Sequence, residues 1–256
     1  MRPMLTLIRR EFTAYFLSPI AYVVLAVFLL VTGHLFYLTM TSLTESGPRG
    51  AEFPMQAFLG NEWFWLVFLF IPPLLTMRLF AEERGSGTLE MLLTAPLRDW
   101  QVVLAKYLAC FAFYVVLWLP TLLYLPVLVK FDWHTLQAGI DPHPVWTSYL
   151  GLALAGAMFL AVGLFVSSLV RSQMVAALIS LVLSLIFVVE AFWPPPPELD
   201  MDSLVYRVLY FFSVPLHFSR DFTRGQVDTR HLILYASVAL FCLFLTVRSL
   251  ETRRWR

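Results

Sequence analysis

The sequence predicts an all-α integral membrane protein with six transmembrane helices, and three observations support this fold class. The 256 residues are 59% hydrophobic and only 14% charged, with a mean hydropathy of +0.75. Soluble domains are about 45–50% apolar and about 25% charged. Six segments are long and apolar enough to cross a hydrocarbon core of about 30 Å. Runs within them, such as residues 22–31, are apolar at every position, which excludes the alternating pattern of barrel strands.

The six predicted spans belong to one transmembrane domain, residues 1–256. Each span must be helical, because lipid offers the backbone no hydrogen-bond partners. Proline removes a backbone donor, so the second span, with Pro72 and Pro73, and the third, with Pro120 and Pro126, should bend or break. The predicted spans cover residues 20–40, 62–81, 103–129, 146–170, 173–193 and 231–248.

Small residues recur four apart in the fourth span, as in the pair Gly151 and Ala155 and the pair Ala157 and Ala161. This spacing lets neighbouring helices approach closely. The contact could be packing within one chain or an interface between two copies, and the sequence does not decide between them.

Two segments outside the spans are predicted to lie along the membrane surface. Residues 1–19 place apolar side chains on one helical face and Arg9, Arg10 and Glu11 on the other, as in an amphipathic elbow helix. Residues 194–230 open with four prolines and continue with an apolar stretch of about ten residues. That stretch is too short to span a bilayer, which predicts a re-entrant or interfacial outer helix.

The basic residues predict the orientation. If the N-terminus is cytoplasmic, twelve of the 18 Lys and Arg residues fall in cytoplasmic segments and six in outer ones. Cytoplasmic segments carry the excess of positive charge in membrane proteins, so both termini are expected in the cytoplasm. The first apolar run is too long for a cleaved signal peptide. The net charge of +1 argues against a nucleic-acid partner, and membrane lipid is the expected surrounding.

The connection between the second and third spans, residues 82–97, is the most informative stretch and reads EERGSGTLEMLLTAPL. Gly85 and Gly87 allow backbone geometry that other residues resist. Thr88 is a candidate N-cap, and a short helix with leucines on one face is expected from Leu89 onward. The segment also carries three acids on the side where basic residues prevail. A short acidic helix is suited to docking against another protein, and a solvated loop is the alternative.

The pattern E-E-R-x-x-G-T-L-E-x-L-L-x-x-P in this connection resembles the hallmark of type-2 ABC exporter permeases. The six-span layout, the N-terminal elbow and the outer segment before the last span are similar to that family as well. The resemblance implies a complex of two transmembrane subunits and two cytoplasmic ABC ATPases. One transmembrane subunit is this chain, and the other is a second copy of it or a close homologue. The resemblance places the connection in a cleft of the ATPase and assigns coupling to Glu82, Glu83, Arg84, Gly85, Gly87, Thr88, Leu89 and Glu90.

Two further stretches resemble the branch that contains gliding-motility permeases. They are R-E-F-x-x-Y-F-x-S-P-I-A-Y at residues 10–22 and H-F-x-x-x-F-x-R-G-x-V-D at residues 217–228. This branch implies either export of a substrate or the relay of force to an extracytoplasmic partner. The expected location is the bacterial inner (plasma) membrane.

The chain lacks the G-x-x-x-x-G-K-[ST] phosphate loop, so it is expected to be a permease subunit rather than an enzyme. ATP and Mg²⁺ would be bound by the partner ATPase, and this chain would bind no cofactor. Candidate residues for an outer gate in the fifth span and the outer segment are Glu190, Tyr206, Arg207, His217 and Arg224.

No metal site or catalytic residue is expected. Two D-x-H pairs, at residues 132–134 and 141–143, offer zinc-type ligands but are more typical of solvated loops. The alternative functions are a non-transporting membrane scaffold of an envelope complex and a membrane enzyme acting on lipid. The enzyme would need acids, histidines or a nucleophile converging at one membrane face, and the sequence offers no such set. Substrate identity does not follow from the sequence.

Overall fold

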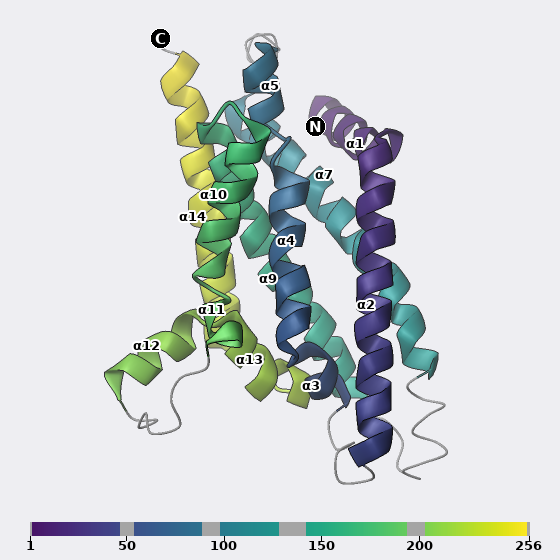
Figure 1. The fold of residues 1–256 in the computed structure, drawn as a ribbon. Coiled ribbons are helices and arrows are strands. Elements are labelled where there is room, and N and C mark those ends of the chain that lie inside the picture. Colours follow the sequence, from purple (N-terminus) through teal and green to yellow (C-terminus); the bar gives the residue numbers. More distant parts are fainter. Residues whose placement is uncertain (1, 47–53, 89–97, 128–141, 194–202, 255–256) are drawn as a thin grey trace.

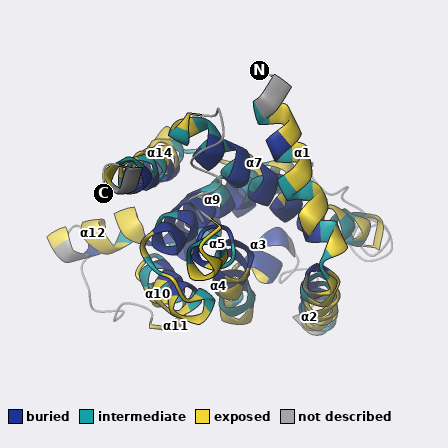
Figure 2. Ribbon diagram, turned by 90° about the horizontal axis from the view of Figure 1, so that it is seen from above, coloured by how far each residue is buried: buried dark blue, intermediate teal, exposed yellow. Residues whose placement is uncertain are grey.

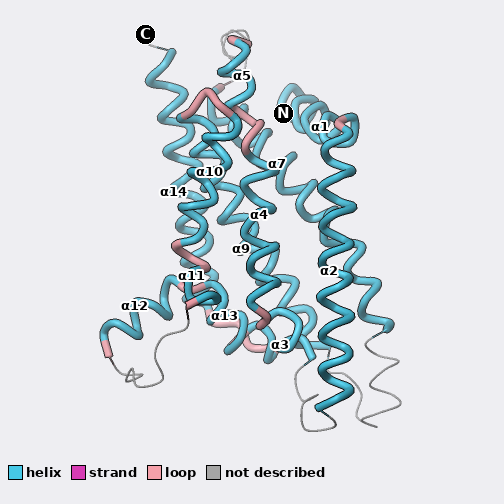
Figure 3. Tube along the Cα trace, viewed as in Figure 1, coloured by secondary structure: helices cyan, strands magenta, loops and turns pink. Residues whose placement is uncertain are grey.

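The computed structural model describes residues 2–46, 54–88, 98–127, 142–193 and 203–254. Within these ranges the chain is helical throughout apart from turns and short connections, which confirms the all-α prediction (Figure 3). The elements in chain order are α1 (Arg2–Leu17), α2 (Pro19–Ser46), α3 (Pro54–Leu59), α4 (Glu62–Thr76), α5 (Ala81–Ser86), α7 (Asp99–Trp118), the 3₁₀ turn η1 (Leu119–Leu123), α9 (Pro142–Leu169), α10 (Gln173–Leu185), α11 (Val189–Phe192), α12 (Leu204–Phe212), α13 (Val214–Arg220), the 3₁₀ turn η2 (Phe222–Arg224) and α14 (Thr229–Arg254).

Five helical segments are long and apolar enough to cross a membrane, and each coincides with a predicted span. All five exceed the roughly 20 residues that a bilayer crossing requires. The chain is therefore a multi-pass membrane protein. The five candidate spans are Ala21–Ser42, Glu62–Ser86, Asp99–Val127, His143–Leu169 and Thr229–Thr252.

The remaining predicted span, residues 173–193, is not one continuous helix. It consists of the 13-residue α10 and the four-residue α11, separated by a tight turn at residues 186–188. The carbonyl of Phe187 accepts a hydrogen bond from the Val214 N–H at 2.9 Å, while the Ala191 N–H bonds to the carbonyl of Val188. A tertiary contact with α13 thus takes the carbonyl that a continuous helix would use.

The prolines act differently in the two predicted bent spans. Helix α4 continues through Pro72 and Pro73, both buried, and ends at Thr76, before the turn that leads to α5. Helix α7 tightens at Pro120 into the 3₁₀ turn η1. The missing N–H of Pro120 and the bulk of its ring disfavour a regular α-helical turn, which accounts for the change there, whereas α4 accommodates Pro72 and Pro73 near its C-terminal end.

Helix α9 is the centre of the bundle. Buried residues concentrate in α4, α7 and α9, whereas α2, α10 and α14 expose their outer sides (Figure 2). A Cβ added at Gly156 would lie 2.3 Å from the Tyr114 ring, and one at Gly163 would lie 2.1 Å from the Thr76 hydroxyl. Ala155 and Ala161 are fully buried. The small residues of the fourth span therefore serve packing within the chain.

The two ends of the bundle carry different elements (Figure 1). Helix α1, helix α5 and the C-terminal part of α14 lie at one end, and α3, α11, α12 and α13 lie at the other. Helix α10 leads the chain from the first end towards the second, where α11 begins. The predicted coupling segment and the predicted outer segment are thus at opposite ends of the molecule.

Candidate functional site

The predicted coupling segment contains a short helix, α5, that includes both of its first acids. Helix α5 ends at Gly87, whose φ of 75° is left-handed, a conformation that terminates many helices and strongly favours glycine. Thr88 follows directly, and its hydroxyl lies 2.9 Å from the Ser86 hydroxyl. The helix expected from Leu89 onward lies outside the described residues, as do Leu89 and Glu90 themselves.

Helix α9 holds α5 in place through two serines. The Ser167 hydroxyl accepts hydrogen bonds from the backbone N–H groups of Phe80 and Ala81, both at 3.1 Å, and donates to the carbonyl of Met77. The first N–H groups of a helix need such an outside partner, so Ser167 caps α5 from another helix. Arg84 donates to the carbonyl of Ser168 at 2.7 Å.

Gly85 allows α5 to approach the connection between α9 and α10. A Cβ at this position would lie 3.0 Å from the carbonyl oxygen of Arg171. Gly85 is helical, so the residue is needed for close approach, whereas Gly87 is needed for its backbone conformation. Together with Arg84 and Ser167, Gly85 attaches the base of α5 to α9 and to the connection that follows it.

The two acids of α5 have different surroundings. Glu82 is exposed. Glu83 turns inward and forms an ion pair with Lys106 of α7, with 2.7 Å between Oε1 and Nζ. The resemblance assigns coupling to both acids, and in the structure the Glu82 side chain is exposed while that of Glu83 is half-buried in the ion pair.

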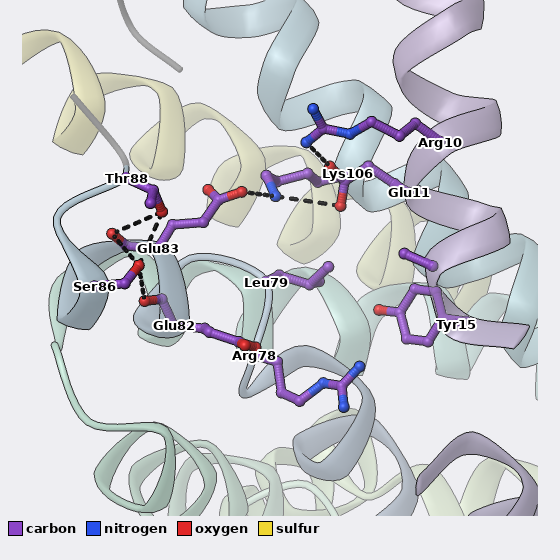
Figure 4. Close-up of a pocket in the computed structure, with 11 residues that line it drawn as sticks. Arg10, Glu11, Tyr15, Arg78, Leu79, Glu82, Glu83, Ser86, Thr88 and Lys106 are labelled. Carbon is purple, nitrogen blue, oxygen red and sulfur yellow. Dashed lines mark hydrogen bonds and ion pairs between the residues drawn. The ribbon is translucent and has the colours of Figure 1, made fainter. Parts of the chain in front are cut away.

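Lys106 is the buried centre of this site (Figure 4). Its side chain is only 2% exposed and it also pairs with Glu11 of α1 at 3.3 Å. The ammonium lies 5.4 Å from the centre of the Phe80 ring. An isolated buried charge is very unfavourable, so a lysine here requires its two carboxylates. In the sequence, Lys106 is one of the twelve basic residues assigned to the cytoplasmic side, and its position as the lone cation of an apolar stretch is the signal that could have identified it.

A cavity of about 350 Å³ lies beside this ion-pair cluster, between α1, α5 and α7. Tyr15 of α1 donates to the carbonyl of Leu75 at 3.0 Å, and Arg78 donates to the Ser18 hydroxyl at 3.1 Å. These bonds attach α1 to the end of α4. The cavity wall is charged, with Arg10, Glu11, Arg78, Glu82, Glu83 and Lys106 among its residues.

At the opposite end of the bundle, Glu190 contacts the start of α13, and His217 lies on α13. The Ser213 hydroxyl donates a hydrogen bond to Glu190 and also accepts one from the Leu216 N–H. Ser213 therefore joins α11 to the N-terminus of α13. The structure brings Glu190 to the outer segment through Ser213, a residue that the sequence does not single out.

His217 is fully buried and neutral. Its Nε2 faces the carbonyl of Tyr210 at 2.7 Å, and because a carbonyl can only accept, Nε2 carries the proton. Its Nδ1 then accepts from the Tyr235 hydroxyl at 2.8 Å. Burial lowers the pKa of His217 to about 4, and the neighbouring His231 adds to that shift. The His231 ring stacks on that of His217 with 3.6 Å between centroids.

Asp221 extends this histidine pair into a network. It lies 2.8 Å from His231 Nε2 and accepts from the Tyr210 hydroxyl at 2.8 Å. Tyr210, Asp221, His231 and Tyr235 were not singled out from the sequence. Only the fold reveals the cluster, because Tyr210 comes from α12, Asp221 follows α13, and His231 and Tyr235 come from α14.

Of the other predicted outer residues, Tyr206 contacts this cluster through its ring. The Tyr206 ring stacks on that of Tyr210 with 6.5 Å between centroids, and the Arg220 guanidinium lies over both rings. Arg207 and Arg224 are exposed.

Among the described residues, no group of three or more His, Cys, Asp or Glu is placed to hold a metal ion. Cys110 and Cys242 are buried free thiols. Of the two D-x-H pairs weighed from the sequence, only His143 is described, and it is exposed.

Comparison with known proteins is consistent with this architecture. The family model described as ABC-2 family transporter protein matches residues 40–217, more than half of the chain and including the whole of α5. No curated protein matches. Permeases of this family generally pair with ABC ATPase subunits and have no ATPase site of their own. The chain therefore belongs to the ABC-2 family of transporter membrane proteins, as one of its permease subunits.

Proposed function

We propose that this chain couples ATP hydrolysis in a separate ABC ATPase to export of a substrate from the cytoplasm. The observation that carries the proposal is the build of α5: Ser167 and Arg84 fix the helix to the core, while Glu82 remains exposed at the end of the bundle. A helix that is attached to the core and exposes an acid is suited to bind a partner and to transmit the partner's movement to the bundle. The absence of a phosphate loop from the sequence means that the energy must come from that partner.

We propose that the chain lies in the bacterial inner membrane with the α5 end of the bundle on the cytoplasmic side. The basic residues around α1, α5 and the last turns of α14 favour this orientation under the positive-inside rule. Both chain termini are then cytoplasmic, and α12 and α13 face outward. The charged face of α1 and its position beside the ends of α4 and α7 support an elbow helix at the inner membrane surface.

A sixth crossing by α10 and α11 is part of the same proposal. Helix α10 alone, with 13 residues, spans about 20 Å at 1.5 Å per residue. Residues 173–192, with the turn and α11 included, reach the roughly 20 residues that a crossing needs. The apolar α12, nine residues long, is too short to cross and supports the re-entrant or interfacial form.

Within the coupling segment we assign different tasks to the two acids. Glu82 contacts the ATPase, and Glu83 holds α5 against the bundle through Lys106. A charge reversal at Glu82 should place like charges against a basic cleft, which costs several kcal/mol. We therefore expect Glu82→Lys to reduce recovery of the ATPase with the tagged chain at least about tenfold.

The experiment is purification of the tagged chain from its native membrane in mild detergent, followed by mass-spectrometric identification and quantification of the proteins recovered with it. Glu62→Lys is the matched control, because Glu62 is an exposed glutamate at the opposite end of the bundle. The native chain and Glu62→Lys should recover a phosphate-loop ATPase at near one-to-one stoichiometry.

The same experiment separates the alternatives. Recovery of the native chain without an ATPase, in detergent that preserves a known exporter complex, would favour the non-transporting scaffold. Recovery of the ATPase together with extracytoplasmic proteins would favour the gliding-type relay of force, in line with the resemblance of residues 10–22 and 217–228 to that branch. Equal ATPase recovery with Glu82→Lys and the native chain would remove the assigned role of Glu82.

A further inference from the structure

Lys106 connects three helices with one ammonium group. It lies on α7, it bonds Glu83 of α5 at 2.7 Å, and it bonds Glu11 of α1 at 3.3 Å. Its side chain is 2% exposed, while those of Glu11 and Glu83 are 12% and 20% exposed. The cation is thus almost withdrawn from solvent, and both of its partners are partly withdrawn.

Helices α1 and α7 do not need this lysine to stay together. The ring of Tyr15 stacks on that of Phe113 with 4.8 Å between centroids, and Phe16 contacts the same ring edge-on at 5.5 Å. Aromatic packing of this kind holds two helices without help from charges. We treat α1 and α7 as one pair for the rest of this argument.

The contact between α5 and the α1–α7 pair is made by charged groups instead of aromatic rings. A charged cavity of about 350 Å³ lies where α5 faces α1, and Lys106 bridges it (Figure 4). Without the lysine, Glu11 and Glu83 would present two carboxylates to the same partly buried space, and like charges there repel. The ammonium therefore both attracts α5 and cancels the repulsion that would drive it away.

We propose that Lys106 is the positioning residue that makes α5 and the α1–α7 pair move as one body when the ATPase acts on α5. This rests on the proposed function for the part that involves the ATPase. The part that concerns the link itself belongs to the chain alone and can be tested without a partner.

The test measures two distances by spin labelling. One label pair, at Thr13→Cys and Ser86→Cys, reports the distance from α1 to α5. The reference pair, at Thr13→Cys and Trp100→Cys, reports the distance from α1 to α7. All three sites are exposed, and the two native cysteines are buried, so labelling should be selective.

In the ATPase-free chain, Lys106→Met should shift the α1–α5 distance to longer values and broaden its distribution, while the α1–α7 distance stays unchanged. Lys106→Arg, which keeps the charge, should restore the narrow distribution. Lys106→Met combined with Glu83→Gln should return the distance part of the way, because one of the two repelling charges is gone. Arg248→Gln is the control, since it removes an exposed ion pair to Glu251 on α14.

If Lys106→Met fails to fold, Glu83→Gln in the otherwise native chain provides the test. It leaves Lys106 paired with Glu11 and should broaden the α1–α5 distribution alone. An α1–α5 distribution that neither variant changes would overturn the proposal, and so would an equal change in both label pairs.

With the co-purified ATPase trapped by vanadate, the native chain should keep its α1–α5 distance, whereas Lys106→Met should change it on trapping. An α1–α5 distance that changes equally in both chains would overturn the joint movement. Failure to recover any ATPase would instead refute the proposed function, and the ATPase-free distances would still decide the role of Lys106.

Discussion

At the scale of single residues, neighbours in the sequence can have opposite tasks. Glu82 and Glu83 differ only in the direction in which α5 presents them: one is exposed, and the other pairs with the buried Lys106. On a helix, successive residues are about 100° apart, so one of two adjacent acids can face the bundle while the other faces away. The sequence motif does not distinguish the two acids. Only the packing of α5 against the bundle shows which of them is exposed.

Protonation of His217 should destabilise the outer segment. Burial lowers its pKa in the folded protein to about 4, against about 6.5 in an unfolded chain. Below pH 6.5 the unfolded state binds a proton at this histidine that the folded state does not bind. The free energy of unfolding therefore decreases as the pH drops from about 6.5 towards 4. We expect the melting temperature of the detergent-purified native chain to decrease over this range.

His217→Gln should reduce that pH dependence, because an amide can still donate to the Tyr210 carbonyl and accept from the Tyr235 hydroxyl but does not titrate. The measurement is the melting temperature at pH 7 and pH 5 for both proteins. His34→Gln is the control, since His34 is exposed on α2. The charged and titratable neighbours His231 and Asp221 remain in both. Equal losses on acidification would show that His217 is not responsible.

At the scale of helices, the length of the apolar segments predicted the five candidate spans correctly. It could not show where a contact with another part of the chain interrupts a helix. The turn at residues 186–188 carries no glycine or proline. It forms because Val214 of α13 donates to the carbonyl of Phe187. The start of α5 was equally hidden: its cap is Ser167, a residue of α9 that is far away in the sequence. Local capping rules look for the partner nearby.

The cap from α9 leads to a prediction about α5. Ser167→Ala should leave the N–H groups of Phe80 and Ala81 without their partner, and an unpaired buried N–H costs about 1–3 kcal/mol. We expect amide exchange in residues 80–86 to accelerate by about tenfold or more, as measured by hydrogen exchange with mass spectrometry.

Ser237→Ala is the matched control, because the Ser237 hydroxyl bonds only to the carbonyl of Leu234 within its own helix, α14. It should leave exchange in α5 unchanged. Native exchange rates in Ser167→Ala would mean that α5 keeps its place without this cap, held by its remaining contacts through Glu83, Arg84 and Gly85.

At the scale of the whole molecule, the placement of charge agrees with the architecture. The ion pairs around Lys106 lie at the same end as α1 and α5, and the histidine and aspartate network lies at the other. The two polar clusters are thus separated by the apolar length of the bundle. This separation suits a protein in which an ATPase moves one end and the movement acts at the other. The orientation of the two ends relative to the membrane depends on whether α10 and α11 form a sixth crossing.

Cysteine labelling of intact cells with a membrane-impermeant maleimide tests for this sixth crossing. Ser172→Cys precedes α10 and Thr229→Cys begins α14, and both sites are exposed. If α10 and α11 cross the membrane, Thr229→Cys should react in intact cells and Ser172→Cys only after permeabilisation. If they do not cross, the two sites lie on the same side and should react alike. Ser86→Cys and Glu62→Cys calibrate the inner and outer sides, and the reverse labelling of these two would invert the orientation that places α5 in the cytoplasm.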